Sequence, residues 1–266
     1  MLAYHKISEL IKEKKTLLCV GLDTDLEKIP EVFPKNSDGI VQFNKEIIEA
    51  TKDLAVAYKI NFAFYEQYGV AGFKALEKTF KLISNKYFTI ADAKRGDIGN
   101  TSLSYASSVF DYFNADSITV NPYMGYDSLS PFFKFKDKIV FILALTSNPG
   151  AFDYQKLKVE GEELYKIVIK KTSVSYNFEQ TGYVVGATHP DELKVIRKLI
   201  PKHLLLIPGV GAQGGSIPDV LEANGCAPAI VNVSRAIIYP EGDGDYFELV
   251  RQKAEYYAKL LTCPRV

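Results

Sequence analysis

The chain has 266 residues, of which 47% are hydrophobic and 24% are charged. This is the composition of a folded globular protein rather than a disordered one, and the length suits one large domain with a full hydrophobic core. Lysine and arginine together number 32, as do aspartate and glutamate, so the formal net charge is zero. A general nucleic-acid or membrane-surface binder needs a basic excess, so the charge balance argues against both classes.

The cysteines and the N-terminal segment indicate the cellular setting. Cys19, Cys226 and Cys263 are odd in number and widely spaced, without a CxxC motif, so we expect neither a disulfide framework nor a zinc site. Residues 1–15 are polar and amphipathic, unlike a secretory signal, and no apolar run approaches the roughly 20 residues of a membrane-spanning helix. We therefore expect a soluble, cytoplasmic protein.

Eight short apolar runs, rich in β-branched residues, recur along the chain. They lie at residues 17–22, 55–60, 87–91, 117–120, 139–145, 182–185, 204–207 and 229–233. Because they lack strict polar alternation, they are typical of strands that are buried on both faces of a parallel sheet. Several end in Gly, Asp, Asn, Pro or Ser, which are residue types that favour turns.

Helical periodicity separates many of these runs. Apolar residues recur at 3.6-residue spacing over residues 37–51, 73–83, 162–178, 190–200 and 246–261. Eight strands alternating with helices over about 250 residues predict a (β/α)8 TIM barrel of the α/β class, with a doubly wound open sheet as the alternative. No composition shift marks a boundary, so we expect residues 1–266 to form a single domain. The longest irregular piece, residues 147–161, is a candidate lid.

In such a barrel, the reacting groups follow the C-terminal ends of the strands. The densest polar stretch at that level is residues 92–101, DAKRGDIGNT. Asp92 and Lys94 are two residues apart, so on an extended strand both side chains point to the same side. They could be catalytic groups or a structural ion pair at the barrel mouth. Asp97 falls near the start of the next helix, where it could be catalytic or could cap that helix.

Three further strand ends carry polar residues whose roles the spacing leaves open. Asp23 follows the first strand and could accept a sugar hydroxyl or cap a helix. Lys59 ends the second strand and could form a Schiff base, donate a hydrogen bond or balance an acid. Ser147 follows the fifth strand, where a turn hydroxyl is the common role. The three histidines have no metal-ligand spacing, so we expect no metal site.

The loops after the seventh and eighth strands are suited to binding an anion. Residues 208–215 have the sequence PGVGAQGG, and Ser234 and Arg235 follow the eighth strand. Barrels often bind phosphate with these two loops, because glycines let backbone N–H groups approach an anion and an arginine completes the cradle. A glycine-rich turn without a ligand is the alternative. The GxGxxG spacing of residues 209–214 matches a dinucleotide fingerprint only weakly, since it follows the seventh strand rather than the first.

The stretch 92–101 resembles the signature of the orotidine 5′-phosphate decarboxylase family, and the two residues between Lys94 and Asp97 resemble its type II subgroup. The resemblance extends over about residues 17–240. It includes Asp23, Lys59, Ser147, residues 208–215 and the Ser234–Arg235 pair, each at the strand end where the family has its counterpart.

This resemblance implies a (β/α)8 barrel that converts orotidine 5′-monophosphate to uridine 5′-monophosphate and CO₂. That reaction is the last step of de novo UMP synthesis, and in the family it needs no metal or organic cofactor. The resemblance also implies a homodimer with active sites at the interface. In the family, the residues that match Asp97 and Thr101 come from the neighbouring subunit.

The resemblance also assigns roles to the matching residues. Lys94 is the implied proton donor to the C6 carbanion, within a network of alternating charge formed with Lys59, Asp92 and Asp97 of the partner subunit. Because each lysine lies between acids, both are expected to stay protonated. The implied substrate-binding residues are Asp23, Thr101, Ser147, Gln213, Gly214, Gly215, Ser234 and Arg235.

Three other functions fit the same layout. An enzyme similar to Mg²⁺-dependent 3-keto-gulonate 6-phosphate decarboxylase or hexulose phosphate synthase would share the Asp-x-Lys-x-x-Asp pattern. A Schiff-base aldolase would use Lys59 or Lys94. A non-catalytic protein that binds a phosphate ligand would need the glycine-rich loops but not the acid–lysine array.

Overall fold

The computed structural model describes residues 2–83, 85–211 and 214–262. Eight parallel strands form a closed barrel in the order β1-β10-β9-β8-β5-β4-β3-β2. The strands are β1 Leu18–Gly21, β2 Ala57–Asn61, β3 Phe88–Arg95, β4 Ser117–Val120, β5 Ile139–Leu145, β8 Thr181–Val185, β9 Leu204–Ile207 and β10 Ala229–Val233. All eight expected strands are present. The pairing of β1 with β10 closes the sheet, which confirms the (β/α)8 barrel and excludes the open sheet.

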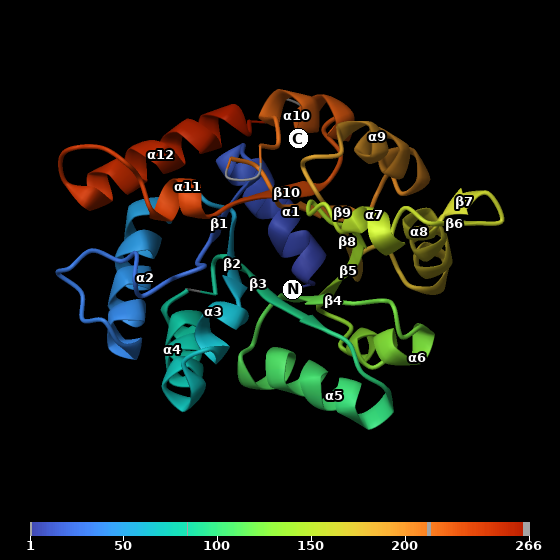
Figure 1. The fold of residues 1–266 in the computed structure, drawn as a ribbon, viewed down its shortest axis with the longest axis horizontal. Coiled ribbons are helices and arrows are strands. Elements are labelled where there is room, and N and C mark those ends of the chain that lie inside the picture. Colours follow the sequence, from blue (N-terminus) through green and yellow to red (C-terminus); the bar gives the residue numbers. More distant parts are fainter. Residues whose placement is uncertain (1, 84, 212–213, 263–266) are drawn as a thin grey trace.

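The helices surround the barrel, as Figure 1 shows. The longer helices are α1 Ala3–Lys14, α2 Ser37–Thr51, α4 Gly69–Leu82, α5 Gly99–Ser107, α8 Leu164–Ser175, α9 Pro190–Leu199, α10 Ile217–Asn224 and α12 Tyr246–Leu260. The shorter ones are α3 Ala63–Glu66, the π-helix η1 Ser108–Tyr112, α6 Tyr126–Leu129, the 3₁₀-helix η2 Phe132–Lys134, α7 Ala151–Tyr154 and α11 Arg235–Ile238. Among the described residues, no helix is both long enough and apolar enough to span a membrane.

Helix α1 covers the N-terminal end of the barrel. Its buried face includes Ile7, Leu10 and Ile11, which lie three or four residues apart. Its polar face is tied to the barrel by Lys6, whose Nζ lies 2.7 Å from Oδ2 of Asp116, the residue before β4. The opposite end, where the strands finish, is the end at which barrels bind their substrates.

Helix α2 has the expected bounds because a capping side chain fixes its start. The side-chain oxygen of Asn36 accepts hydrogen bonds from the backbone N–H groups of Asp38 and Gly39. The apolar face that the sequence predicts then packs inward, with Ile40 and Phe43 fully buried.

Two regions differ from the expectation drawn from periodicity. The segment after β5 is not irregular, because it contains α7 and an antiparallel hairpin of β6 Lys158–Val159 and β7 Glu162–Glu163. Glu160 and Gly161, between these strands, both have positive φ, as a tight two-residue hairpin requires. Helix α5, which the sequence placed just after Asp97, shows no apolar periodicity because its sequence is largely polar and buries only Ser102 and Ala106.

Candidate active site

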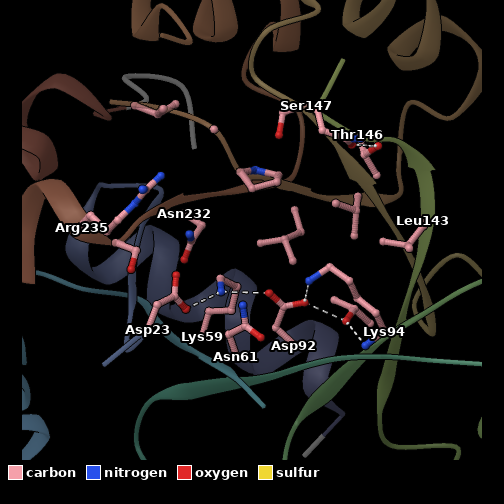
Figure 2. Close-up of a pocket in the computed structure, with 18 of the residues that line it drawn as sticks. Asp23, Lys59, Asn61, Asp92, Lys94, Leu143, Thr146, Ser147, Asn232 and Arg235 are labelled. Atoms are coloured by element: carbon pink, nitrogen blue, oxygen red, sulfur yellow. Dashed lines mark hydrogen bonds and ion pairs between the residues drawn. The ribbon is translucent and has the colours of Figure 1, made fainter. Parts of the chain in front are cut away.

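A pocket of about 390 Å³ lies at the C-terminal end of the barrel, within the range of roughly 300–1,000 Å³ that small-molecule sites occupy. It is lined by residues that come from strands far apart in the sequence (Figure 2). Those that the sequence predicted are Asp23, Lys59, Asp92, Lys94, Ser147, Ser234 and Arg235. The fold therefore brings together most of the expected site.

Four of these side chains form a row of alternating charge (Figure 2). Lys59 Nζ lies 3.0 Å from Asp23 Oδ1 and 2.9 Å from Asp92 Oδ2. On the far side of Asp92, Lys94 Nζ lies 2.6 Å from Oδ1. In the order Asp23–Lys59–Asp92–Lys94, each inner group thus lies between two groups of opposite charge.

Burial and ion pairing shift the pKa values of the two inner groups, Lys59 and Asp92, in opposite directions. Burial lowers the pKa of Lys59, but the carboxylates of Asp23 and Asp92 outweigh this effect and hold that pKa above its usual range. Burial raises the pKa of Asp92, but the ammonium groups of Lys59 and Lys94 outweigh it and hold that pKa well below 3.8. Both inner groups are therefore charged at neutral pH.

Thr119, on β4, completes the coordination of the Asp92 carboxylate and was not predicted. Its Oγ1 donates to Asp92 Oδ1 at 3.0 Å and accepts the backbone N–H of Lys94 at 2.9 Å. Together with the two lysines, it fixes the orientation of the carboxylate. A threonine within an apolar strand gives no distinctive sequence signal, because β-branched residues are common in buried strands.

The backbone at Lys94 departs from the extended strand that the sequence suggested. Its φ is +46°, and the pairing of β3 with β4 shifts register between Ala91 and Arg95. Asp92 and Lys94 do meet, but through this bulge. A left-handed conformation in a non-glycine residue costs about 1–3 kcal/mol and is typical of functional sites. The bulge leaves the Lys94 side chain 50% exposed within the pocket.

Arg235 and Lys94 lie at opposite ends of the pocket (Figure 2). Among the residues that the structure describes, none forms a hydrogen bond or ion pair with the Arg235 guanidinium. Beside it, Ser234 Oγ donates to the carbonyl oxygen of Gly21 at 3.0 Å. A Cβ on Gly21 would lie 2.7 Å from the Cβ of Ser234, so this close approach requires glycine just before the Asp23 loop.

The loop after β9 is built on glycines that adopt positive φ. Gly209, Gly211 and Gly214 have φ values of +99°, +82° and +82°, a region that favours glycine. Gly209 lines the pocket together with its neighbours, whereas Gly214 and Gly215 do not. Gly215 instead donates its N–H to the carbonyl of Gly209 at 3.1 Å. Gln213, which the sequence placed in this loop, lies outside the described residues.

Asp97 and Thr101 do not line the pocket of their own subunit. Asp97 Oδ1 accepts the N–H of Ile98 at 2.8 Å, and α5 begins at Gly99 with Ile98 as its N-cap. The alternative role of Asp97 as the helix cap is therefore wrong. Asp97 precedes the N-cap residue Ile98 and bonds to the N–H of that residue rather than to an N–H within the helix. Thr101 lies exposed in the first turn of α5.

Several polar residues line the pocket that the sequence did not single out as site residues. Ser147, which was expected there, is accompanied by further side chains from neighbouring strand ends. These are Asn61, Thr119, Thr146, Asn148 and Asn232. Across residues 2–83, 85–211 and 214–262, no cluster of three or more His, Cys, Asp or Glu side chains is arranged to hold a metal ion.

The sequence matches the model of the "Orotidine 5'-phosphate decarboxylase / HUMPS family" over residues 16–244. The chain belongs to this family. Two relatives named orotidine 5′-phosphate decarboxylase are close to it in sequence. The protein from Flavobacterium johnsoniae is 50% identical over 255 residues, which cover 94% of this chain and 93% of that protein. The protein from Bacteroides fragilis strain YCH46 is 49% identical over 257 residues, which cover 94% of each.

Solved structures of the family share the whole fold. The Leishmania donovani OMP decarboxylase superposes with a TM-score of 0.85 at 35% identity and covers 99% of this chain and 100% of its own. The Leishmania donovani UMP synthase gives a TM-score of 0.87 at 37% identity, and the chain spans 56% of that longer protein. The family resemblance inferred from residues 92–101 is thus confirmed, while the type II assignment stays a prediction.

Proposed function

We propose that this chain decarboxylates orotidine 5′-monophosphate to uridine 5′-monophosphate, the last step of de novo UMP synthesis, as a single-domain enzyme. The observation that carries the proposal is the Asp23–Lys59–Asp92–Lys94 row in one pocket with Arg235. Relatives that share about 50% sequence identity with this chain and are named for this reaction support it.

Lys94 is the group we propose to act at the reacting carbon. Loss of CO₂ from C6 leaves an electron pair in the ring plane, which the pyrimidine π system does not delocalise. The ammonium of Lys94 is already held in the pocket by Asp92, so it stabilises this charge without reorganisation. It then gives a proton to C6: the electron pair of the broken C–C bond becomes the new C–H bond, and solvent reprotonates the lysine. Asp92 lies beside the departing carboxylate, where repulsion in the bound state favours its loss.

The remaining pocket residues bind the substrate in this proposal. Asp23 and Lys59 bind the ribose hydroxyls, and Ser147 binds the pyrimidine edge. Arg235 holds the 5′-phosphate together with Gln213 and Ser234. The N–H groups of Gly214 and Gly215 instead bond to the carbonyl oxygens of Gly211 and Gly209. Arg235 lies at the opposite end of the pocket from Lys94 (Figure 2), so the phosphate is remote from C6. Its binding energy serves to position the pyrimidine ring.

We further propose a homodimer in which Asp97 and Thr101 of the partner subunit complete each pocket. This is supported by their place at the start of α5, outside their own pocket. Mixing inactive Lys94→Ala with inactive Asp97→Ala subunits tests it. With random C2 pairing, about a quarter of the sites regain both groups, so activity should return on mixing. No recovery would contradict a site shared between subunits.

Metal-stripped enzyme in EDTA provides the test of the function, with the loss of orotidine 5′-monophosphate absorbance as the readout. We expect full activity, because Asp23 and Asp92, the carboxylates that Mg²⁺ would need, are both engaged by Lys59. Activity lost in EDTA and restored by Mg²⁺ would favour the Mg²⁺-dependent alternative. A borohydride-trapped adduct would favour the Schiff-base aldolase. The free thiols of Cys19 and Cys226 suit the cytoplasmic location that we propose.

A further inference from the structure

Tyr239, at the C-terminal end of α11, links the segment that carries Arg235 to the loop that carries Asp23. Its hydroxyl oxygen accepts the backbone N–H of Asp25 at 2.7 Å and lies 3.5 Å from the carbonyl oxygens of Asp23 and Asp25. The backbone N–H of Tyr239 donates to the carbonyl oxygen of Arg235 at 3.0 Å. One residue thus touches both the arginine segment and the loop that bears Asp23.

The loop after β1 depends on such contacts for its shape. Residues 22–36, all of which the structure describes, form no helix or strand. Asp23 stands at the start of this loop and holds Lys59 at 3.0 Å. The Tyr239 ring is itself fixed, because it stacks on Phe43 of α2 with centroids 5.9 Å apart and an interplanar angle of 11°. A rigid ring therefore anchors an otherwise irregular loop.

The chemistry of the phenol suits it for this position. Burial raises the pKa of Tyr239 above its usual value, so the hydroxyl stays protonated and can both accept from Asp25 and donate to a carbonyl. A phenylalanine would keep the stack on Phe43 but leave the Asp25 N–H without this acceptor.

We propose that Tyr239 is a positioning residue that couples phosphate binding at Arg235 to the placement of Asp23 and Lys59. The inference rests on the proposed function. Through its two hydrogen bonds, Tyr239 fixes the segment that carries Arg235 relative to the loop on which Asp23 stands. A phosphate held by Arg235 is therefore held at a set position relative to the charge row, and its binding energy places the substrate against Asp23 and Lys59.

Tyr246 supplies a matched control. Its hydroxyl donates to the carbonyl of Ile238 at 2.7 Å, and its ring packs against the same Phe43 with centroids 6.1 Å apart. Tyr246→Phe therefore removes a comparable hydrogen bond from a tyrosine hydroxyl to α11. It leaves the hydrogen bond between Tyr239 and the Asp25 backbone intact. A general loosening of this aromatic cluster would affect both variants alike.

A double-mutant cycle on decarboxylation kinetics tests the coupling. We expect Tyr239→Phe to lower kcat about tenfold in the parent background, with little change in KM, but less than about twofold in the Arg235→Ala background. Tyr246→Phe should have the same small effect in both backgrounds. Equal factors for Tyr239→Phe in the two backgrounds would overturn the coupling. A parent inactive on orotidine 5′-monophosphate would instead refute the proposed function, and the inference with it.

Discussion

Replacing Lys59 with methionine removes the cation that lies between two buried carboxylates, at nearly constant side-chain volume. The Lys59 side chain is 5% exposed, and those of Asp23 and Asp92 are 16% and 9% exposed. At the observed separations and an effective dielectric constant of about 20, each attraction is about 5.5 kcal/mol before desolvation. Burial of the ammonium offsets much of this. We expect the free energy of unfolding to fall by about 3–5 kcal/mol at pH 7.5, because the variant leaves buried acids without their partner.

The pH dependence of this loss has a definite sign. In the parent, the pKa of Asp92 is depressed, so its contribution to stability is fully present above about pH 4 and is lost as the pH falls through the folded-state value. In Lys59→Met, two carboxylates face each other without the lysine, and their repulsion raises a pKa. Protonation of one carboxylate then relieves this repulsion in the variant as the pH falls. The difference in the free energy of unfolding between parent and variant should therefore become smaller from pH 7.5 to pH 5.

Urea unfolding at both pH values measures the effect, with Lys78→Met as the control. Lys78 Nζ lies 3.0 Å from Asp38 Oδ1, but the two side chains are 56% and 64% exposed. Removing this surface pair should cost less than about 1 kcal/mol. The reasoning would be refuted if Lys59→Met cost no more than the control, or if its deficit grew on acidification.

Three further predictions concern other parts of the fold. Arg235→Ala should raise KM more than it lowers kcat in steady-state assays, and an equal, mild change in both would contradict its place at the phosphate. Arg197→Met should lower the free energy of unfolding by about 3 kcal/mol in urea without changing KM, because three backbone carbonyls and Asn224 lose their donor; a cost below about 1 kcal/mol would refute this. Burial and the nearby Arg197 lower the pKa of His203 to about 4, so stability should be complete above about pH 6.5 and decline by at most about 3 kcal/mol toward pH 4. His203→Phe should flatten that decline, and an unchanged pH profile would count against it.

The barrel could be predicted because its signal is repeated and local. Each strand is an apolar run buried on both faces, and helix α2 combines an apolar stripe with its capping residue Asn36. Helix α5 could not be found in this way, since its sequence is polar and its buried face small. The hairpin after β5 was missed because strands of two residues are too short to show a period.

The site was predictable to the extent that barrel geometry gathers strand ends. Lys59 and Asp92 lie toward the C-terminal ends of the neighbouring strands β2 and β3, so their contact follows from the topology. The pairing of Lys59 with Asp23 did not follow, because Asp23 belongs to an irregular loop whose course is set by Tyr239 and other distant residues. Thr119 was missed since its role depends on the register shift beside Lys94. The contribution of Asp97 depends on a second subunit and remains a prediction.

The most direct test of the proposed chemistry is the rate at which Lys94→Ala decarboxylates orotidine 5′-monophosphate in EDTA, measured beside the parent. We predict that the parent retains full activity under these conditions. The variant should remain folded, since the Lys94 side chain is half exposed, but lose at least about 10³-fold in turnover. A folded variant that turns over within about tenfold of the parent would contradict the assignment of Lys94 as the group that stabilises and protonates C6.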